Sequence, residues 1–266
     1  MVIEEVSRSQ VLMDGINLAV RVRGRPESLG FFWLNGYRSD MLGTKACYVD
    51  SLAKKLDSFC LRFDYSGHGE SGGEFILGTI SKWLSEAAFV YEKFATAPQI
   101  LIGSSMGGWI ALRLYEILKA KGKAPKGIIL LAPAPDFTKA LLYKKMTEEQ
   151  KKSLAEKGYF EEPSAYSPEP NIFTKALLED GENNLIMQGL LEIDCPVHIL
   201  HGMKDVDVPY EHSLALLEHL PKQNVNLSLI HDGDHRLSRA QDLVFLEKII
   251  CMMREQILQE ESLKST

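Results

Sequence analysis

The residues best suited to do chemistry lie in Gly103-Ser-Ser-Met-Gly107, which has the pattern G-x-S-x-G around Ser105. Between a strand and a helix, this pattern forms a nucleophile elbow, a sharp turn that exposes the serine hydroxyl. Gly103 and Gly107 flank the serine because the turn leaves no room for Cβ atoms. Ser104 lacks glycines at the matching offsets, so we predict that Ser105 is the nucleophile.

A serine hydroxyl needs a general base, and the base needs a carboxylate to orient it. In chains with this elbow, the carboxylate and then the histidine follow the serine in sequence. Asp205 and Asp207 both follow the apolar run 197–200, so on position alone either could be the carboxylate. His235 follows the next apolar run and is the predicted base. His231 lies closer to that run and is interpreted as structural.

The oxyanion that forms during acyl transfer needs N–H donors. The amide of Met106, the residue after the nucleophile, is one predicted donor. The second should come from the loop after the predicted strand 30–34, where Gly36 permits close approach, so we predict the amide of Tyr37. The Tyr37 side chain is expected to form a wall of the pocket.

Other titratable residues are interpreted as non-catalytic. Asp64 and His68 precede the nucleophile in the chain and are predicted to brace nearby loops. His231 and His235 are four residues apart but flank an Asp-Gly pair, not a helix, and no third ligand is evident. We therefore predict no metal site and no cofactor. Three more residues are expected to be surface or loop-bracing side chains: Arg38, Asp40 and Lys45.

Apolar runs that alternate with helical patterns must position these residues. A hairpin is predicted at 9–23 around an Asp-Gly turn. Further strands are predicted at 30–34, 59–63, 100–102, 127–132, 196–200 and 225–230. Helices are predicted at 44–58, 79–95, 108–121, 210–220 and 238–259, followed by a frayed tail. This alternation predicts the α/β class, with a mostly parallel central sheet of about eight strands and helices on both faces.

The alternation stops between 136 and 193. Two helix-like segments, 137–157 and 171–188, flank a stretch that contains three prolines. We interpret 136–193 as a cap inserted into a core made of 1–135 and 194–266. Its many apolar side chains lead us to expect acyl-chain selection there.

The bulk properties exclude some classes of protein. A net charge of −6, with both signs spread along the chain, argues against a nucleic-acid partner. Four cysteines without a C-x-x-C pair indicate free thiols in a reducing compartment. The start of the chain lacks a basic, apolar leader, and the longest apolar run is too short for a transmembrane segment. We therefore expect a cytoplasmic protein, and we leave its oligomeric state open.

Together these motifs resemble the α/β-hydrolase superfamily over nearly the whole chain. The chain is further similar to the family of α/β-hydrolase domain-containing protein 10 and its bacterial relatives. The stretches that carry this similarity are 35–46, 61–67, 98–109, 163–167, 201–205 and 234–236. The resemblance implies hydrolysis of acyl groups, including S-palmitoyl thioesters on proteins, acyl glucuronides and simple carboxylic esters.

The resemblance also implies a triad of Ser105, Asp205 and His235. The family's acid pattern D-x-x-V-P fits 205–209 and leaves Asp207 outside. The chain departs from the superfamily at Asn35, where many members have histidine. It also departs from the animal members, which carry a mitochondrial leader, so an organellar location is not implied.

We therefore predict a serine hydrolase that cleaves acyl thioesters or carboxylic esters through an acyl-enzyme, in the manner of a palmitoyl-protein thioesterase. Its substrate would be a small molecule or an acylated protein. A small-ester carboxylesterase or a serine peptidase with the same triad is the nearest alternative. A non-catalytic binding protein with the same fold is an alternative of another class, which the complete triad and both elbow glycines disfavour.

Overall fold

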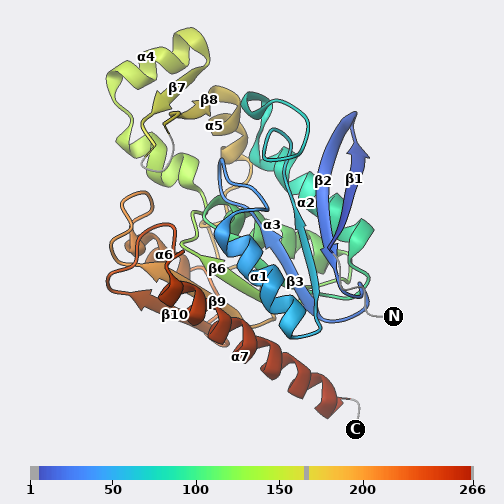
Figure 1. Ribbon diagram of the computed structural model, residues 1–266. Helices are drawn as coiled ribbons and strands as arrows, with labels where there is room; N and C mark the ends of the chain where they lie inside the picture. The colour runs from blue at the N-terminus through green and yellow to red at the C-terminus, as the bar shows by residue number, and fades with distance from the viewer. Residues whose placement is uncertain (1–5, 165–167, 265–266) are drawn as a thin grey trace.

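A computed structural model describes residues 6–164 and 168–264 of the 266-residue chain (Figure 1). The first five residues, on which the expectation of no leader depends, lie outside the described residues. Part of the family-like stretch 163–167 lies outside them as well. Within the described ranges, no helix combines the length and the apolar character needed to cross a bilayer.

The centre of the molecule is an eight-stranded sheet with the order β1-β2-β4-β3-β5-β6-β9-β10. Its strands are β1 (Ser7–Met13), β2 (Ile16–Arg23), β3 (Gly30–Leu34), β4 (Phe59–Phe63), β5 (Ile100–Ser104), β6 (Gly127–Leu131), β9 (Val197–Gly202) and β10 (Val225–Ile230). The hairpin β1–β2 is antiparallel and joins β4 in antiparallel register, whereas all other pairs are parallel. The predicted mostly parallel sheet of about eight strands is confirmed.

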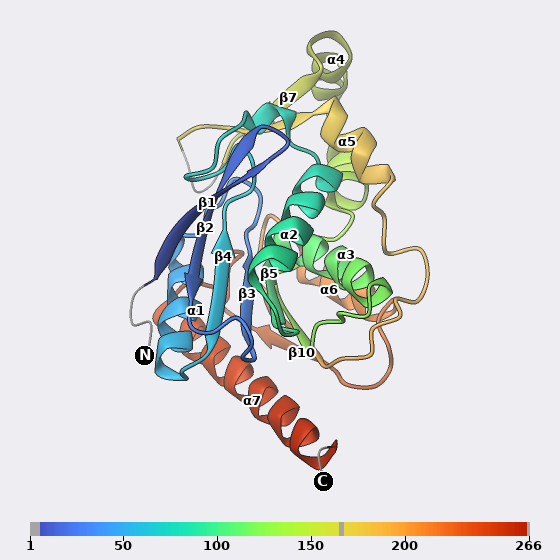
Figure 2. The same ribbon diagram turned by 90° about the vertical axis from the view of Figure 1, so that its right-hand side faces the viewer.

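Helices cover both faces of this sheet (Figures 1 and 2). One apolar core contains residues of α2 (Ile80–Phe94), α3 (Met106–Ala120) and α6 (Tyr210–Leu217). The other contains residues of α1 (Thr44–Lys55) and α7 (Ala240–Lys264). Side chains alternate between the two faces of a strand, so strand β3 contributes to both cores. Phe32 and Leu34 lie in the first core, and Phe31 and Trp33 lie in the second.

Most of the segment between β6 and β9 forms a lobe above the main sheet in Figure 1, and its buried side chains, among them Phe160 and Leu177, belong to the first core. It contains a π-helix η2 (Thr138–Tyr143), α4 (Glu148–Lys157), the antiparallel pair β7 (Tyr159–Glu162) and β8 (Asn171–Thr174), and α5 (Lys175–Glu182). The short 3-10 helix η1 (Phe75–Leu77) of the core contacts β8.

Two expectations for helices are corrected by the structure. The predicted helix 171–188 begins as strand β8, because Ile172 and Phe173 pair with β7 and the helix starts only after Thr174, which caps α5 with its side chain. The tail expected to fray after 259 continues as α7 to Lys264. An ion pair between Lys126 and Glu261, with a 3.0 Å N–O distance, ties this last part of α7 to the core.

Candidate active site

The turn between β5 and α3 exposes Ser105 in a strained conformation, with φ 54° and ψ −119°. Only glycine fits at the two flanking positions, because a side chain there would collide with backbone atoms. A Cβ on Gly103 would lie 2.3 Å from the carbonyl oxygen of Gly107, and a Cβ on Gly107 would lie 2.1 Å from that of Leu34. Helix α3 begins at Met106, two residues earlier than predicted, so its N-terminus lies directly behind Ser105.

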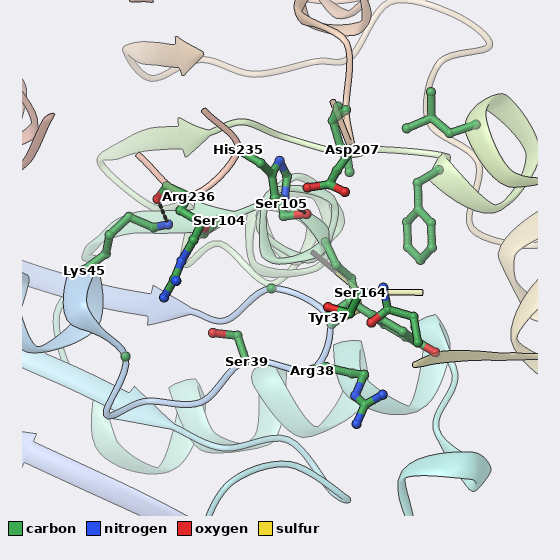
Figure 3. A pocket seen from close by; sticks show the side chains of 18 of the residues that line it. Tyr37, Arg38, Ser39, Lys45, Ser104, Ser105, Ser164, Asp207, His235 and Arg236 are labelled. Atoms are coloured by element: carbon green, nitrogen blue, oxygen red, sulfur yellow. Dashed lines mark hydrogen bonds between the residues drawn. The ribbon is translucent and has the colours of Figure 1, made fainter. Parts of the chain in front are cut away.

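Ser105, His235 and Asp205 form one chain of hydrogen bonds. Ser105 Oγ lies 3.1 Å from His235 Nε2, and His235 Nδ1 lies 2.7 Å from Asp205 Oδ2. Figure 3 shows His235 directly above Ser105 at the pocket. The three residues come from the ends of three different strands, which the fold brings to one edge of the sheet.

The Asp205 carboxylate is inaccessible to solvent and accepts four hydrogen bonds. Oδ1 accepts from the amides of Asp207 and Val208 at 3.0 and 2.8 Å, and Oδ2 accepts from His235 and His201. Burial by itself would raise the pKa of Asp205, but these hydrogen bonds outweigh it and hold the pKa at about 2. The carboxylate is therefore ionised at neutral pH.

His201 is a member of this network that the sequence analysis missed. Its Nε2 lies 3.1 Å from Asp205 Oδ2 and 2.9 Å from the Val208 carbonyl oxygen, and its Nδ1 lies 2.6 Å from Ser213 Oγ. Both neighbours of Nε2 are acceptors, so this nitrogen carries a proton. The signal in the sequence was a histidine at the end of the buried strand β9, which also contains His198.

Within the described residues, neither Asp207 nor His231 joins this chain of hydrogen bonds through its side chain. Asp207 contributes its backbone amide to Asp205, while its side chain is exposed at the pocket (Figure 3). Asp205, Asp207 and His235 each offer one atom that could bind a metal ion, and these three atoms lie within 4.8 Å of one another. Asp205 and His235, however, are hydrogen-bonded to each other. His231, expected to be structural, is exposed on the surface.

The loop after β3 brings the Tyr37 amide beside the nucleophile. A Cβ on Gly36 would lie 3.3 Å from Ser105 Cβ, so this loop touches the elbow. Within the described residues, neither the Tyr37 amide nor the Met106 amide has a hydrogen-bond acceptor. Both donors are therefore available to a ligand at Ser105.

The Tyr37 side chain connects this loop to the inserted lobe. Its hydroxyl donates to the carbonyl oxygen of Ile172 in β8, and its ring stacks on Phe173 with the centroids 5.2 Å apart. The next residue, Arg38, donates to the carbonyl oxygen of Pro170 and forms an ion pair with Glu169 at 2.8 Å. Two consecutive residues of the core loop are thus tied to β8 and the stretch before it.

Asp64, His68 and Asn35 brace the same loop. The two carboxylate oxygens of Asp64 each accept a backbone amide. His68 Nε2 accepts the Arg38 amide at 3.3 Å, and burial lowers the pKa of His68 to about 4, which keeps it neutral. Asn35, where many superfamily members have histidine, bridges the Trp33 indole and the carbonyl oxygen of Phe63.

Ser105 opens into a pocket of about 530 Å³, within the usual size range for small-molecule sites. The inserted lobe contributes apolar side chains to it: Phe137, Leu141, Leu142 and Phe173. The N-terminus of α1 and the loop before α7 contribute polar ones, among them Lys45 and Arg236 (Figure 3). Lys45 lines the pocket, and its ammonium also donates to the Arg236 carbonyl oxygen, in line with the expected loop-bracing role.

Comparisons with known proteins agree with this architecture. The model of the alpha/beta hydrolase family matches residues 31–246. The crystal structure of a protein from Agrobacterium vitis S4 is 52% identical, with a TM-score of 0.90, and covers 94% of this chain and 98% of that one. The structure of mouse alpha/beta hydrolase domain-containing protein 10 is 30% identical, with a TM-score of 0.83, and covers 94% of this chain and 99% of that one.

Among curated proteins, the chain is 37% identical over 153 residues to the human palmitoyl-protein thioesterase ABHD10, mitochondrial. The match covers 58% of this chain and 48% of the human protein. The matched region therefore spans about half the length of that relative.

Proposed function

Because the chain belongs to the alpha/beta hydrolase family, we propose that it is a serine hydrolase that cleaves acyl thioesters or carboxylic esters through an acyl-enzyme. The observation that carries this proposal is the continuous chain of hydrogen bonds from Ser105 Oγ through His235 to Asp205, which opens into a pocket. In this reading Ser105 is the nucleophile, His235 the base and Asp205 the orienting acid.

The first half of the reaction acylates the enzyme. His235 Nε2 takes the proton of Ser105 while Oγ attacks the carbonyl carbon of the substrate. The negative charge that develops on the carbonyl oxygen is stabilised by the amides of Tyr37 and Met106. Asp205 holds the Nδ1 proton of His235 and stabilises the imidazolium that forms. Acylation is complete when the bond between the carbonyl carbon and the sulfur or oxygen of the leaving group breaks, and the imidazolium of His235 gives its Nε2 proton to the departing thiol or alcohol.

The second half restores the enzyme. His235 removes a proton from a water molecule as the water oxygen attacks the acyl carbon, then the bond to Ser105 Oγ breaks, His235 returns the proton to Oγ, and the acid is released. All the groups needed are amides and side chains of this chain, so the mechanism requires no cofactor.

The inserted lobe, 136–193, acts in this proposal as a cap that binds the acyl chain. Its apolar side chains face the pocket, where an acyl chain gains free energy by leaving water. The human relative is named a palmitoyl-protein thioesterase. We propose that this chain likewise cleaves acyl thioesters, on proteins or on small molecules. A cytoplasmic location stays a prediction, because the human relative is a mitochondrial protein by name.

One experiment separates this function from its alternatives. Fluorophosphonate labelling tests for an activated serine, and a panel of acyl thioesters, p-nitrophenyl esters and aminoacyl amides tests the bond that is cleaved. Labelling together with the highest kcat/KM on thioesters supports the proposal. The absence of labelling would favour a binding protein, and the highest kcat/KM on short esters or amides would favour an esterase or a peptidase.

A further inference from the structure

One side of the pocket is built to hold a negative charge. Lys45 and Arg236 line it together, and Figure 3 shows their side chains next to each other on one side of Ser105. The Lys45 ammonium donates to the carbonyl oxygen of Arg236. Burial and then the charge of Arg236 lower the pKa of Lys45 to about 8. Burial and the neighbouring positive charge of Arg236 therefore both disfavour the charged form of Lys45.

The carboxylates whose charges act on Lys45 are those of Asp234, Asp242 and Asp205, and each accepts a hydrogen bond from another group. Asp234 accepts the Leu237 amide at 3.0 Å, and Asp242 is paired with Arg239 at 2.8 Å. Asp205 carries the four hydrogen bonds described above. Within the described residues, Lys45 has no carboxylate at ion-pair distance.

The N-terminus of α1 adds backbone donors on the same side. The helix is 12 residues long, its N-cap Gly43 provides no side-chain cap, and its first turn contains no acidic residue. The amides of Thr44, Lys45 and Ala46 have no acceptor among the described residues, and all three residues line the pocket. Free amides and the positive end of a helix dipole are the usual components of a phosphate site.

This side of the pocket is adjacent to the leaving group. In the proposed reaction the leaving group departs toward His235, which protonates it. Arg236 is the residue directly after His235, and its carbonyl oxygen holds Lys45. The apolar side chains that would take the acyl chain come instead from η2 and β8 of the inserted lobe.

Resting on the proposed function, we propose that the leaving group of the natural substrate carries a phosphate, which Lys45, Arg236 and the first-turn amides of α1 bind. The number of donors favours phosphate over carboxylate, because the three first-turn amides of α1 and the Lys45 ammonium together offer more N–H groups than two carboxylate oxygens can accept. Three acidic residues, Asp40, Glu162 and Asp207, also line the pocket. Glu162 lies on β7 of the inserted lobe and accepts from the Gln150 side chain at 3.1 Å. Asp40 accepts the Leu42 amide at 2.8 Å, and Asp207 lies on the far side of His235 (Figure 3).

The test uses three octanoyl thioesters that differ only in the thiol: 2-mercaptoethanol, 3-mercaptopropionate and 2-mercaptoethyl phosphate. In the wild-type chain, kcat/KM on the phosphate thioester should exceed that on the neutral thioester about tenfold or more. Lys45→Met and Arg236→Gln should each bring this ratio close to one. Lys145→Met removes a cation that lines the pocket from the end of η2, and it should keep the ratio.

A measurement of binding affinity tests the phosphate site without relying on catalytic turnover. Calorimetry on Ser105→Ala should show that 2-mercaptoethyl phosphate binds at least tenfold more tightly than 2-mercaptoethanol, and that Lys45→Met removes the difference. Equal binding of the two thiols would overturn the inference, whatever the wild-type activity. A preference for the carboxylate thioester equal to or above that for the phosphate thioester would refute the assignment of phosphate.

Discussion

His201 and His235 donate to the same oxygen of Asp205, from distances of 3.1 and 2.7 Å. One histidine lies at the pocket and reaches Ser105, and the other is fully buried behind the carboxylate. With two backbone amides on the other oxygen, the carboxylate has little freedom to rotate away from His235. The orientation of the proposed base therefore depends on a second histidine that never contacts substrate.

His201→Phe should lower kcat about tenfold or more and leave KM nearly unchanged. The change removes a buried hydrogen bond to a charged group, an interaction that contributes about 1.5–3 kcal/mol. His201→Gln keeps an N–H group and should recover most of the rate. His198→Phe is the matched control, because His198 is buried on the same strand and bonds Ser228 instead. Equal losses in the two Phe variants would assign His201 a structural role only.

Ser105→Ala should abolish both hydrolysis and fluorophosphonate labelling while leaving the circular dichroism spectrum unchanged. Among the serines of the described residues, Ser105 alone has its hydroxyl within hydrogen-bond distance of His235. The neighbouring Ser104→Ala should still label. If Ser104→Ala were inactive and Ser105→Ala labelled normally, the nucleophile would be misassigned.

Asp205→Asn should reduce kcat by roughly 10³–10⁴, because an amide cannot hold the Nδ1 proton of His235 in the productive tautomer. Asp207→Asn should cost less than tenfold, since only its backbone amide contacts Asp205. Steady-state kinetics on a p-nitrophenyl ester compares the two. A larger loss in Asp207→Asn would reverse the assignment.

The preference for a phosphate leaving group should decline as the pH rises from 7 to 9. Lys45 has a pKa lowered to about 8, so it is mostly charged below that value and mostly neutral above it. The ratio of kcat/KM on phosphate and neutral thioesters, measured across this range, checks the prediction. Arg236 stays charged throughout, so part of the preference should survive at pH 9. A ratio independent of pH would exclude a contribution from the Lys45 charge.

Activity should rise with acyl-chain length until the apolar side of the pocket is full. Each methylene removed from water contributes about 0.8 kcal/mol, so four carbons add up to ~3 kcal/mol, or on the order of a hundredfold in kcat/KM. A series of thioesters from C2 to C16 measures the profile. A maximum at C2 followed by a steady decline would favour the small-ester alternative.

The fold and the elbow could be predicted from the sequence because their signals are local. Apolar runs, turn residues and the two glycines around Ser105 each depend on near neighbours in the chain. The choice of Asp205 over Asp207 rested on resemblance, since position along the chain allowed either. In the structure the Asp205 side chain, and not that of Asp207, is hydrogen-bonded to His235.

The errors arose where distant segments meet. Residues 171–174 form a strand only because β7 pairs with them, and that pairing has no signature within the segment itself. The place of Lys45 at the pocket has no local signal, because it depends on how α1 meets the loop before α7. His201 has a partner four residues along the chain, but only the bend after β9 brings the two side chains together.

The hydrogen bond between Tyr37 and Ile172 limits how this protein can be re-engineered. A chimera that exchanges the whole lobe for that of another hydrolase would also exchange the carbonyl group that holds the Tyr37 hydroxyl and the Phe173 ring on which Tyr37 stacks, and the Tyr37 amide would lose its support. Recombination junctions placed after Thr174 would keep β8 with the core and leave α5 open to exchange. Libraries that vary η2 and α5 but keep 169–174 should therefore yield more active clones than libraries that replace the entire lobe.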